Sequence, residues 1–75
     1  MNLLVTVTSL DGNLLTVRDE GDSNITTLRL APTWAIFRWV PEGSYLLKSV
    51  VATGGSPAWM LWESAHVERI PDEAA

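Results

Sequence analysis

The stretch Trp34–Tyr45, WAIFRWVPEGSY, concentrates the features that decide how this 75-residue chain folds, and it holds four of the six aromatic residues. Its second half contains a turn signal, because Pro41 presets φ for the first turn position and Gly43 can adopt the left-handed conformation. A hairpin through this turn would set Trp39 against Tyr45, an aromatic pair of the kind that stabilises sheets. We therefore expect two aromatic-rich strands joined at this turn.

The segment just before the turn, Thr33–Val40, is ambiguous between a strand and a short helix. Pro32 and Thr33 could begin a helix, which would match the connection between the third and fourth strands of an OB-fold. The segment is only two turns long, is rich in aromatic and β-branched residues, and is stopped by Pro41. These properties favour a strand, with the short helix as the alternative.

Upstream, three segments alternate apolar and polar residues as β-strands do. They are residues 3–10, 14–19 and 25–30. A three-residue loop at Asp11–Asn13, with its last residue left-handed, would pair Val7 with Val17. A two-residue loop at Gly21–Asp22, of type II′, would pair Val17 with Thr26. Both turns keep the same apolar face inward, so the three strands are predicted to form a meander.

Downstream, the strand after Gly43 is expected to reach Val51 or Ala52 and to be followed by a flexible loop at Thr53–Pro57. The remaining elements predicted are a strand at Ala58–Glu63, a tight helical turn at Ser64–His66 and a last strand at Val67–Ile70. The closing segment Trp62–Pro71, WESAHVERIP, resembles the end of SH3-like barrels, in which a helical turn leads into a "V-E-x-I" strand. The resemblance implies a small SH3-like barrel. It implies no proline-peptide site, because the acidic aromatic motif and adjacent Trp pair of true SH3 domains are missing.

The fold class predicted is all-β: a small meander barrel of five or six antiparallel strands, SH3-like or OB-like, with one short helical turn near Ser64–His66. Residues 1–70 are expected to form a single domain, and residues 71–75 a frayed acidic tail. A chain of this length buries only about 60% of its unfolded surface. Large aromatic side chains and oligomerisation are the remedies open to a sequence without cysteine.

Composition restricts the function classes. The net charge is −4 and the five cations are scattered along the chain, whereas nucleic-acid binding usually needs clustered cations. No apolar run approaches the ~20 residues needed to cross a bilayer, and no secretory signal is recognisable. We expect a cytoplasmic soluble protein that contacts no membrane and binds nucleic acid only as an alternative function.

No motif indicates catalysis, a cofactor or a metal. The single histidine, His66, has no partner group placed for it by the sequence. The acidic turn Asp19–Asp22 lacks the pattern and length of a calcium loop. We therefore expect a protein that is not an enzyme, with no catalytic, cofactor-binding or metal-binding residues.

The predicted hairpin has two faces. The face assigned to the core holds Ala35, Phe37, Trp39, Tyr45, Leu47 and Val51. The opposite face mixes cations with large apolar groups where a solvated face would be polar. Either the barrel closes over both faces, or the C-terminal tail covers one of them, or the second face is an interface with the usual composition of binding hot spots. The partner-binding residues predicted on it are Trp34, Ile36, Arg38, Leu46 and Lys48. Trp59 and Trp62 lie three apart in their strand, so one of them should add to the exposed surface.

The function predicted is a non-enzymatic protein–protein interaction module, or a small regulatory or inhibitory protein, that acts through this aromatic and aliphatic face. It would self-associate as a homo-oligomer or dock on a larger protein, whose basic patch the acidic remainder of the chain would suit. The alternative is single-stranded nucleic-acid binding on an OB-like barrel. In that case bases would stack on exposed Trp side chains and phosphates would lie near Arg38 and Lys48.

Overall fold

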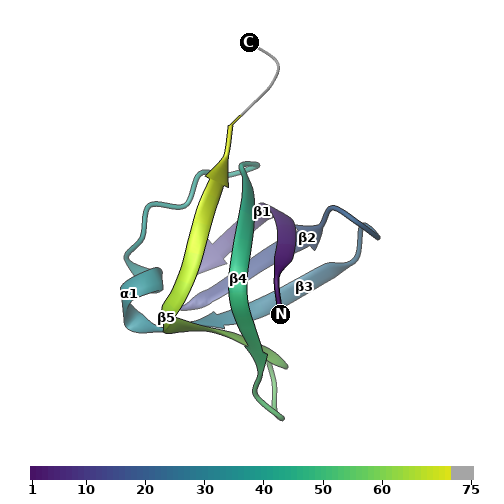
Figure 1. Cartoon of the computed structure of the whole chain (residues 1–75). Coiled ribbons are helices and arrows are strands. Elements are labelled where there is room, and N and C mark those ends of the chain that lie inside the picture. The colour runs from purple at the N-terminus through teal and green to yellow at the C-terminus, as the bar shows by residue number, and fades with distance from the viewer. Residues whose placement is uncertain (72–75) are drawn as a thin grey trace.

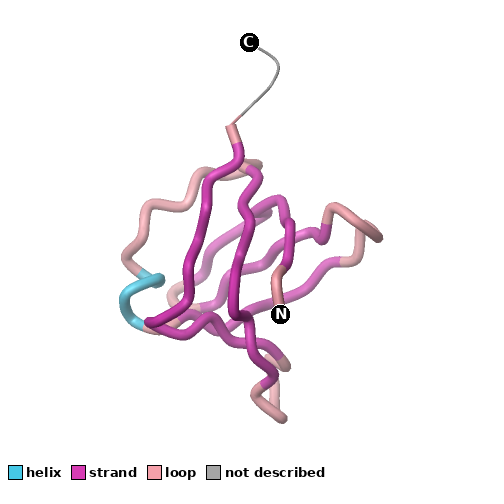
Figure 2. The backbone as a smooth tube through the Cα atoms, in the orientation of Figure 1, coloured by secondary structure: helices cyan, strands magenta, loops and turns pink. Residues whose placement is uncertain are grey.

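Five strands close into a small barrel in the computed structural model, which describes residues 1–71 (Figure 1, Figure 2). The elements are β1 (Leu3–Asp11), β2 (Leu14–Asp19), β3 (Ile25–Leu30), α1 (Pro32–Ala35), β4 (Ser44–Ala52) and β5 (Trp59–Ile70). The all-β barrel predicted from the sequence is confirmed. Of the predicted acidic tail, Pro71 is exposed and outside any strand, and the rest lies outside the described residues.

The strand order around the barrel is β1-β2-β3-β5-β4, with β4 returning to β1. β3 and β5 run parallel, and the other neighbouring pairs are antiparallel. Only β1, β2 and β3 form a meander, so the prediction of an entirely antiparallel meander is wrong. After β3 the chain passes through α1 and a loop before it enters β4, and β5 then occupies the place between β3 and β4 (Figure 1).

The predicted pairs of Val17 with Val7 and with Thr26 are confirmed, whereas the predicted pair of Ser9 with Leu15 is wrong because Ser9 lies opposite Thr16. The turns that produce them differ from the prediction. Asp11 pairs with Leu14, so the first loop has two residues, and a bulge at Thr8 supplies the residue that the shorter loop lacks. The left-handed residue of that loop is Gly12, at φ +61°, rather than Asn13.

The second turn is not the type II′ turn predicted at Gly21–Asp22. Its left-handed residue is Ser23, at φ +63°. Gly21 instead donates its N–H to Asp19 Oδ1 at 2.7 Å. The Asp19 N–H donates to the Asn24 carbonyl at 2.9 Å, so the loop keeps the register that the apolar pattern requires.

The segment Thr33–Val40 is not the strand that we favoured. Pro32 begins the short helix α1, which was the alternative to a strand. The Trp34 and Ala35 N–H groups both donate to the Ala31 carbonyl. After Ala35 the chain continues as an irregular loop to β4. Because no strand precedes the Pro41 turn, the predicted pairing of Trp39 with Tyr45 across a hairpin is wrong.

Gly43 occupies a site that leaves no room for a side chain. A Cβ there would lie 2.9 Å from the Val40 carbonyl oxygen and 3.2 Å from the Tyr45 ring. The left-handed residue of this turn is Glu42, at φ +62°, and not Gly43. The turn therefore selects glycine for close approach rather than for its backbone conformation.

β5 is one long strand with a sharp bend, and the predicted helical turn at Ser64–His66 is wrong. Lys48 of β4 pairs with His66, but the next register pair joins Val50 to Leu61. Residues 62–65 therefore lie opposite the single residue Ser49, whose φ is +66°. Such a bulge bends a strand and re-aims its side chains. In Figure 1 β5 changes direction beside α1.

The barrel interior is filled by aliphatic side chains with two aromatic rings. Its buried members are Val5, Val7, Leu15, Val17, Leu28, Leu30, Trp39, Tyr45, Leu47, Val50 and Leu61. The core assignments of Trp39, Tyr45 and Leu47 are confirmed. Ala35 and Val51 are half-buried, and Phe37 is 36% exposed, so its assignment to the core is wrong.

The bend in β5 can be tested at Ser49. Left-handed backbone costs a residue with a Cβ about 1–2 kcal/mol. We expect Ser49→Gly to raise the free energy of unfolding by about 0.5–1 kcal/mol in urea denaturation. Ser44→Gly, in a regular part of the same strand, should lower it by about the same amount. Equal losses in the two variants would contradict the left-handed conformation of Ser49.

Candidate functional site

Four aromatic rings pack together where α1 and the following loop meet the barrel. The ring centroids of Trp39 and Tyr45 are 5.0 Å apart, those of Phe37 and Trp39 4.9 Å, and those of Trp34 and Phe37 5.4 Å. All three contacts are edge-to-face, an arrangement that stabilises by about 0.5–1.5 kcal/mol per pair beyond area burial. Trp39 and Tyr45 belong to the core, so the cluster joins the loop to the barrel interior.

Three hydrogen bonds fix the polar edges of this aromatic cluster. Trp39 Nε1 donates to the Trp34 carbonyl at 2.8 Å, and Trp34 Nε1 donates to the Trp62 carbonyl at 2.6 Å. The Val40 N–H donates to Tyr45 Oη at 2.8 Å. α1 and its loop are thereby tied to both β4 and β5. The two indoles serve the structure and are not free to swing onto a ligand.

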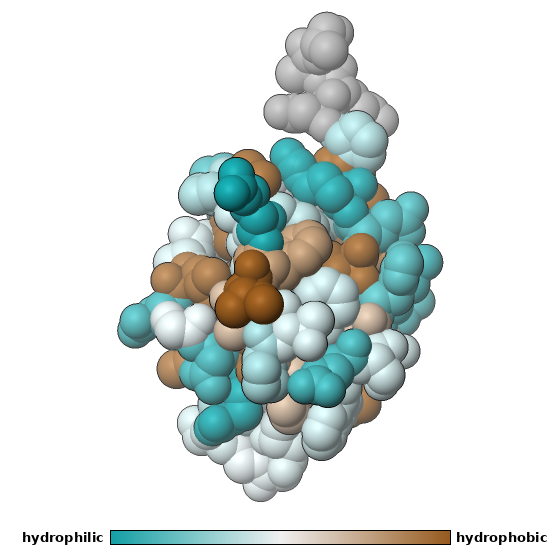
Figure 3. All heavy atoms as spheres, turned by 90° about the vertical axis from the view of Figure 1, so that its left-hand side faces the viewer, coloured by the Kyte–Doolittle hydropathy of each residue, from teal (hydrophilic) through white to brown (hydrophobic). Residues whose placement is uncertain are grey.

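Large apolar side chains are exposed on this cluster and beside it. Ile36 is 87% exposed, Trp62 50%, Val40 43% and Phe37 36%. We call the surface formed by these four residues, together with Trp34 and Arg38, the α1 flank. Figure 3 views the molecule from this side and shows hydrophobic atoms near the middle of the face with hydrophilic atoms around them.

A shallow hollow adjoins the α1 flank between α1 and the bend of β5. Its volume is ≈ 370 Å³, and it is lined by Ala31, Pro32, Met60, Trp62, Glu63 and Ser64. The exposed face of Trp62 forms part of its wall. The flank is therefore not flat, and a partner side chain has a place to insert.

The structure brings three of the five predicted contact residues together. Trp34 is half-buried, and Ile36 and Arg38 are exposed, all on α1 or its loop. Leu46 and Lys48 lie half-buried on β4, and in Figure 1 β5 lies between β4 and α1. Lys48 Nζ is 3.3 Å from Glu68 Oε2. The five residues thus come from two separate places on the barrel.

The sequence alone does not identify Phe37 and Trp62 as residues of the flank. On a strand Phe37 would alternate with Ile36 and face the core, and the loop removes that alternation. Trp59 is half-buried and Trp62 half-exposed, so Trp62 is the member of the pair that adds to the surface. The spacing of three between them was the signal that one would be exposed.

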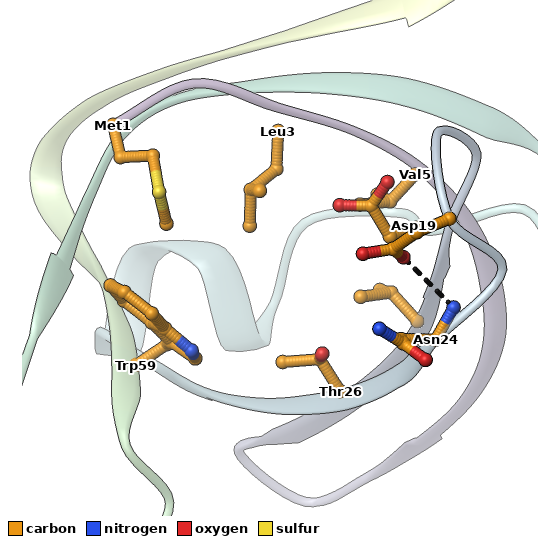
Figure 4. Close-up of a pocket in the computed structure, with 9 residues that line it drawn as sticks. Met1, Leu3, Val5, Asp19, Asn24, Thr26 and Trp59 are labelled. Carbon is orange, nitrogen blue, oxygen red and sulfur yellow. Dashed lines mark hydrogen bonds between the residues drawn. The ribbon is translucent and has the colours of Figure 1, made fainter.

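A small cavity opens at another end of the barrel, and Figure 4 looks into it with α1 behind. It has a volume of ≈ 160 Å³, and the side chains of Met1, Leu3 and Trp59 point into it (Figure 4). Asp19 and Asp22 stand at its rim. Each of these carboxylates accepts a backbone N–H of the β2–β3 turn, from Gly21 and Asn24 respectively. Their positions are thus explained by the turn.

The outer surface of β2 and β3 carries two arginines, Arg18 and Arg29. The pair Lys48–Glu68 is the single salt bridge within residues 1–71, so Arg18 and Arg29 have no carboxylate within 4.0 Å there. A groove of ≈ 530 Å³ runs between β3 and the loop that precedes β5, and Arg29 and Trp59 help to line it.

Within the described part of the chain, no group of three or more potential metal ligands comes together. His66 is exposed and lies opposite Lys48 in the β4–β5 ladder. No helix among these residues has the length and apolar character to span a bilayer. The shape and composition of the surface are therefore the remaining guides to function.

Comparison with models of known protein families, with curated proteins and with solved structures gives no match. Function has to be inferred from the surfaces themselves.

Proposed function

We propose that this protein is a non-enzymatic interaction module whose contact surface is the α1 flank, and that its role is regulatory or inhibitory. The observation that carries the proposal is Ile36, an isoleucine 87% exposed on a loop whose backbone is held by the aromatic cluster. A large aliphatic group on a fixed loop is pre-organised for binding, because little entropy is lost when a partner covers it.

The composition of the flank supports this proposal. Aromatic side chains and arginine dominate binding hot spots, and the flank supplies Trp62, Phe37 and Arg38 around Ile36. The exposed carboxylates of Glu42 and Glu63 belong to the same loop and to the same bend of β5. With a net charge of −4, a second copy would be repelled at long range, whereas a basic partner would be attracted. The partner proposed is a protein with an apolar contact centre and a basic rim.

The proposal also includes the barrel type, which is OB-like rather than SH3-like. A helix between the third and fourth strands and a parallel pairing of β3 with β5 support it. The closing segment, which carried the SH3-like resemblance, has no helical turn. OB-like barrels bind ligands on the face of β2 and β3 and at the neighbouring loops.

Single-stranded nucleic acid is the second candidate, favoured by this strand order and by Arg18 and Arg29, which have no ion-pair partner among residues 1–71. This candidate is less well supported, because bases stack on accessible indoles and those of Trp34 and Trp39 are held by hydrogen bonds. Lys48, which was expected near phosphates, is paired with Glu68. Protein binding at the α1 flank therefore remains the first proposal.

The α1 flank can be tested by a photo-crosslinking residue placed at Ile36 and, as a control, at Leu10, which is 40% exposed on β1. In cells of the native host, one discrete adduct is expected from position 36 and none from position 10. Phe37→Asp should reduce its yield at least tenfold, since hot-spot losses reach about 2 kcal/mol or more. The matched variant Leu10→Asp should leave it unchanged.

The same crosslinked samples show whether the α1 flank binds a basic protein or a second copy of this chain. Adducts of equal yield from positions 36 and 10 would contradict the proposal. An adduct of twice the chain mass, with a matching dimer in light scattering that Ile36→Asp dissolves, would replace the basic partner by a second copy.

The nucleic-acid candidate is tested by tryptophan fluorescence with a single-stranded oligonucleotide at low salt. If bases stacked on exposed indoles, each stacked base would contribute about 1–3 kcal/mol and the emission would be quenched. We expect no saturable quenching. Quenching that saturates, and that weakens with salt in the manner of released counterions, would favour this candidate over the first.

A further inference from the structure

β3 is paired along only half of its outer edge. Its residues from Ile25 to Arg29 pair with β2 on one side. On the other side the parallel ladder with β5 contains only Leu28, Arg29 and Leu30, and it stops at the pair Leu28–Trp59. The first half of β3 therefore faces a groove where a closed barrel would be expected to place a strand.

The backbone groups at this open edge can be assigned from the ladder. The Leu30 N–H donates to the Asn13 carbonyl, on the β2 side, at 2.7 Å. Backbone groups alternate along a strand, so those of Ile25 and Thr27 point away from β2, into the groove. The parallel pair Leu28–Trp59 uses the Thr27 carbonyl. The N–H of Thr27 and both groups of Ile25 remain without a backbone partner within residues 1–71.

The loop before β5 cannot fill this position. Pro57 has no N–H to offer, and its carbonyl accepts a hydrogen bond from Thr53 Oγ1 at 2.6 Å. The Ala58 carbonyl accepts the Thr53 N–H at 2.8 Å. The loop is thus folded on itself, and the groove of ≈ 530 Å³ separates it from β3.

We propose that this groove binds an extended, acidic peptide segment of another protein, which adds a strand to the open edge of β3. Unpaired edge groups are a template for strand addition, and the main-chain bonds supply affinity while alternate side chains supply specificity. This site is distinct from the α1 flank, so the inference goes beyond the interaction proposed above and does not depend on it.

Side chains beside the edge define the chemistry of the segment. Ile25 is 61% exposed, and Arg18 lies opposite it on β2. Arg29 is exposed and lines the groove, and neither arginine has an ion-pair partner among the described residues. An added strand with an apolar residue beside Ile25 and a carboxylate within reach of Arg29 would cover the isoleucine and give Arg29 an ion-pair partner.

A peptide fits this edge better than the other possible occupants. Nucleic acid offers no regular series of main-chain donors and acceptors to meet the N–H and C=O groups of Ile25. A second copy would have to bring a whole barrel past the loop before β5, whose residues 56–58 form the opposite wall of the groove. An extended segment needs only the width of one strand, about 4.8 Å from its neighbour.

The test is amide hydrogen exchange of the ¹⁵N-labelled protein, read by NMR, with a capped hexapeptide that carries valine and glutamate two positions apart among threonines, so that both side chains lie on one face of the added strand. The expected Kd is about 1 mM or tighter. At ten times that concentration, exchange of the Ile25 and Thr27 amides should slow about tenfold. A peptide with lysine in place of glutamate should bind about fivefold more weakly, and Arg29→Glu should reverse that preference.

The control peptide carries N-methyl groups on alternate amides, which removes its backbone donors and keeps its side chains. It should give no protection at Ile25 or Thr27. Equal protection by this peptide, protection at the α1 flank instead, or none at any concentration would overturn the proposal. So would the same protection from a thymidine hexanucleotide, or protection that grows with protein concentration alone, which would assign the edge to nucleic acid or to a second copy.

Discussion

The hydrogen bond from Trp34 Nε1 to the Trp62 carbonyl joins the only helix among the described residues to the bend of β5, and the candidate surface depends on it. The second bond, from Trp39 Nε1 to the Trp34 carbonyl, extends this link into the core, where Trp39 packs against Tyr45. Because hydrogen bonds hold both indoles, the backbone of the loop is fixed in position. Ile36 is left facing outward, while the Trp39 ring is buried in the core and the Trp34 ring is half-buried.

The bend of β5 shapes the α1 flank. It places four residues opposite Ser49, which carries the Trp62 carbonyl toward α1 and exposes the Trp62 side chain. The open edge of β3 has a different origin. β5 runs parallel to β3 and begins at Trp59, opposite Leu28, so residues before Trp59 would be needed to cover Ile25 and Thr27. Those residues fold back onto Thr53 instead. The two candidate surfaces therefore depend on separate features of β5, its bend and the place where it begins.

Much of the barrel was predictable because strand alternation has a period of two and tolerates local errors. Val7, Val17 and Thr26 align as predicted although both turns were assigned the wrong type, since a bulge at Thr8 compensates for a shorter loop.

Residues 33–40 could not be predicted in this way. Their aromatic side chains favour strands locally, but their packing against Tyr45 outweighs that propensity. The exposure of Ile36 and Arg38 was predicted for a strand face and is found on a loop, while Leu46 and Lys48 lie apart from them. The bend at residues 62–65 has no local sequence signature, because it is defined by the pairing of β5 with β4 on the two sides of Ser49.

The central claim is that the aromatic cluster holds the α1 flank in place, and exchange of the four indole N–H groups with solvent tests it most directly. Residue-specific indole signals in ¹⁵N-labelled protein can be followed after transfer to D₂O. The indoles of Trp34 and Trp39, which donate to carbonyl oxygens, should exchange at least about tenfold more slowly than that of Trp62, which has no hydrogen-bond acceptor among residues 1–71. Exchange of the Trp34 indole as fast as that of Trp62 would show that the flank is not fixed to β5 and would contradict the account.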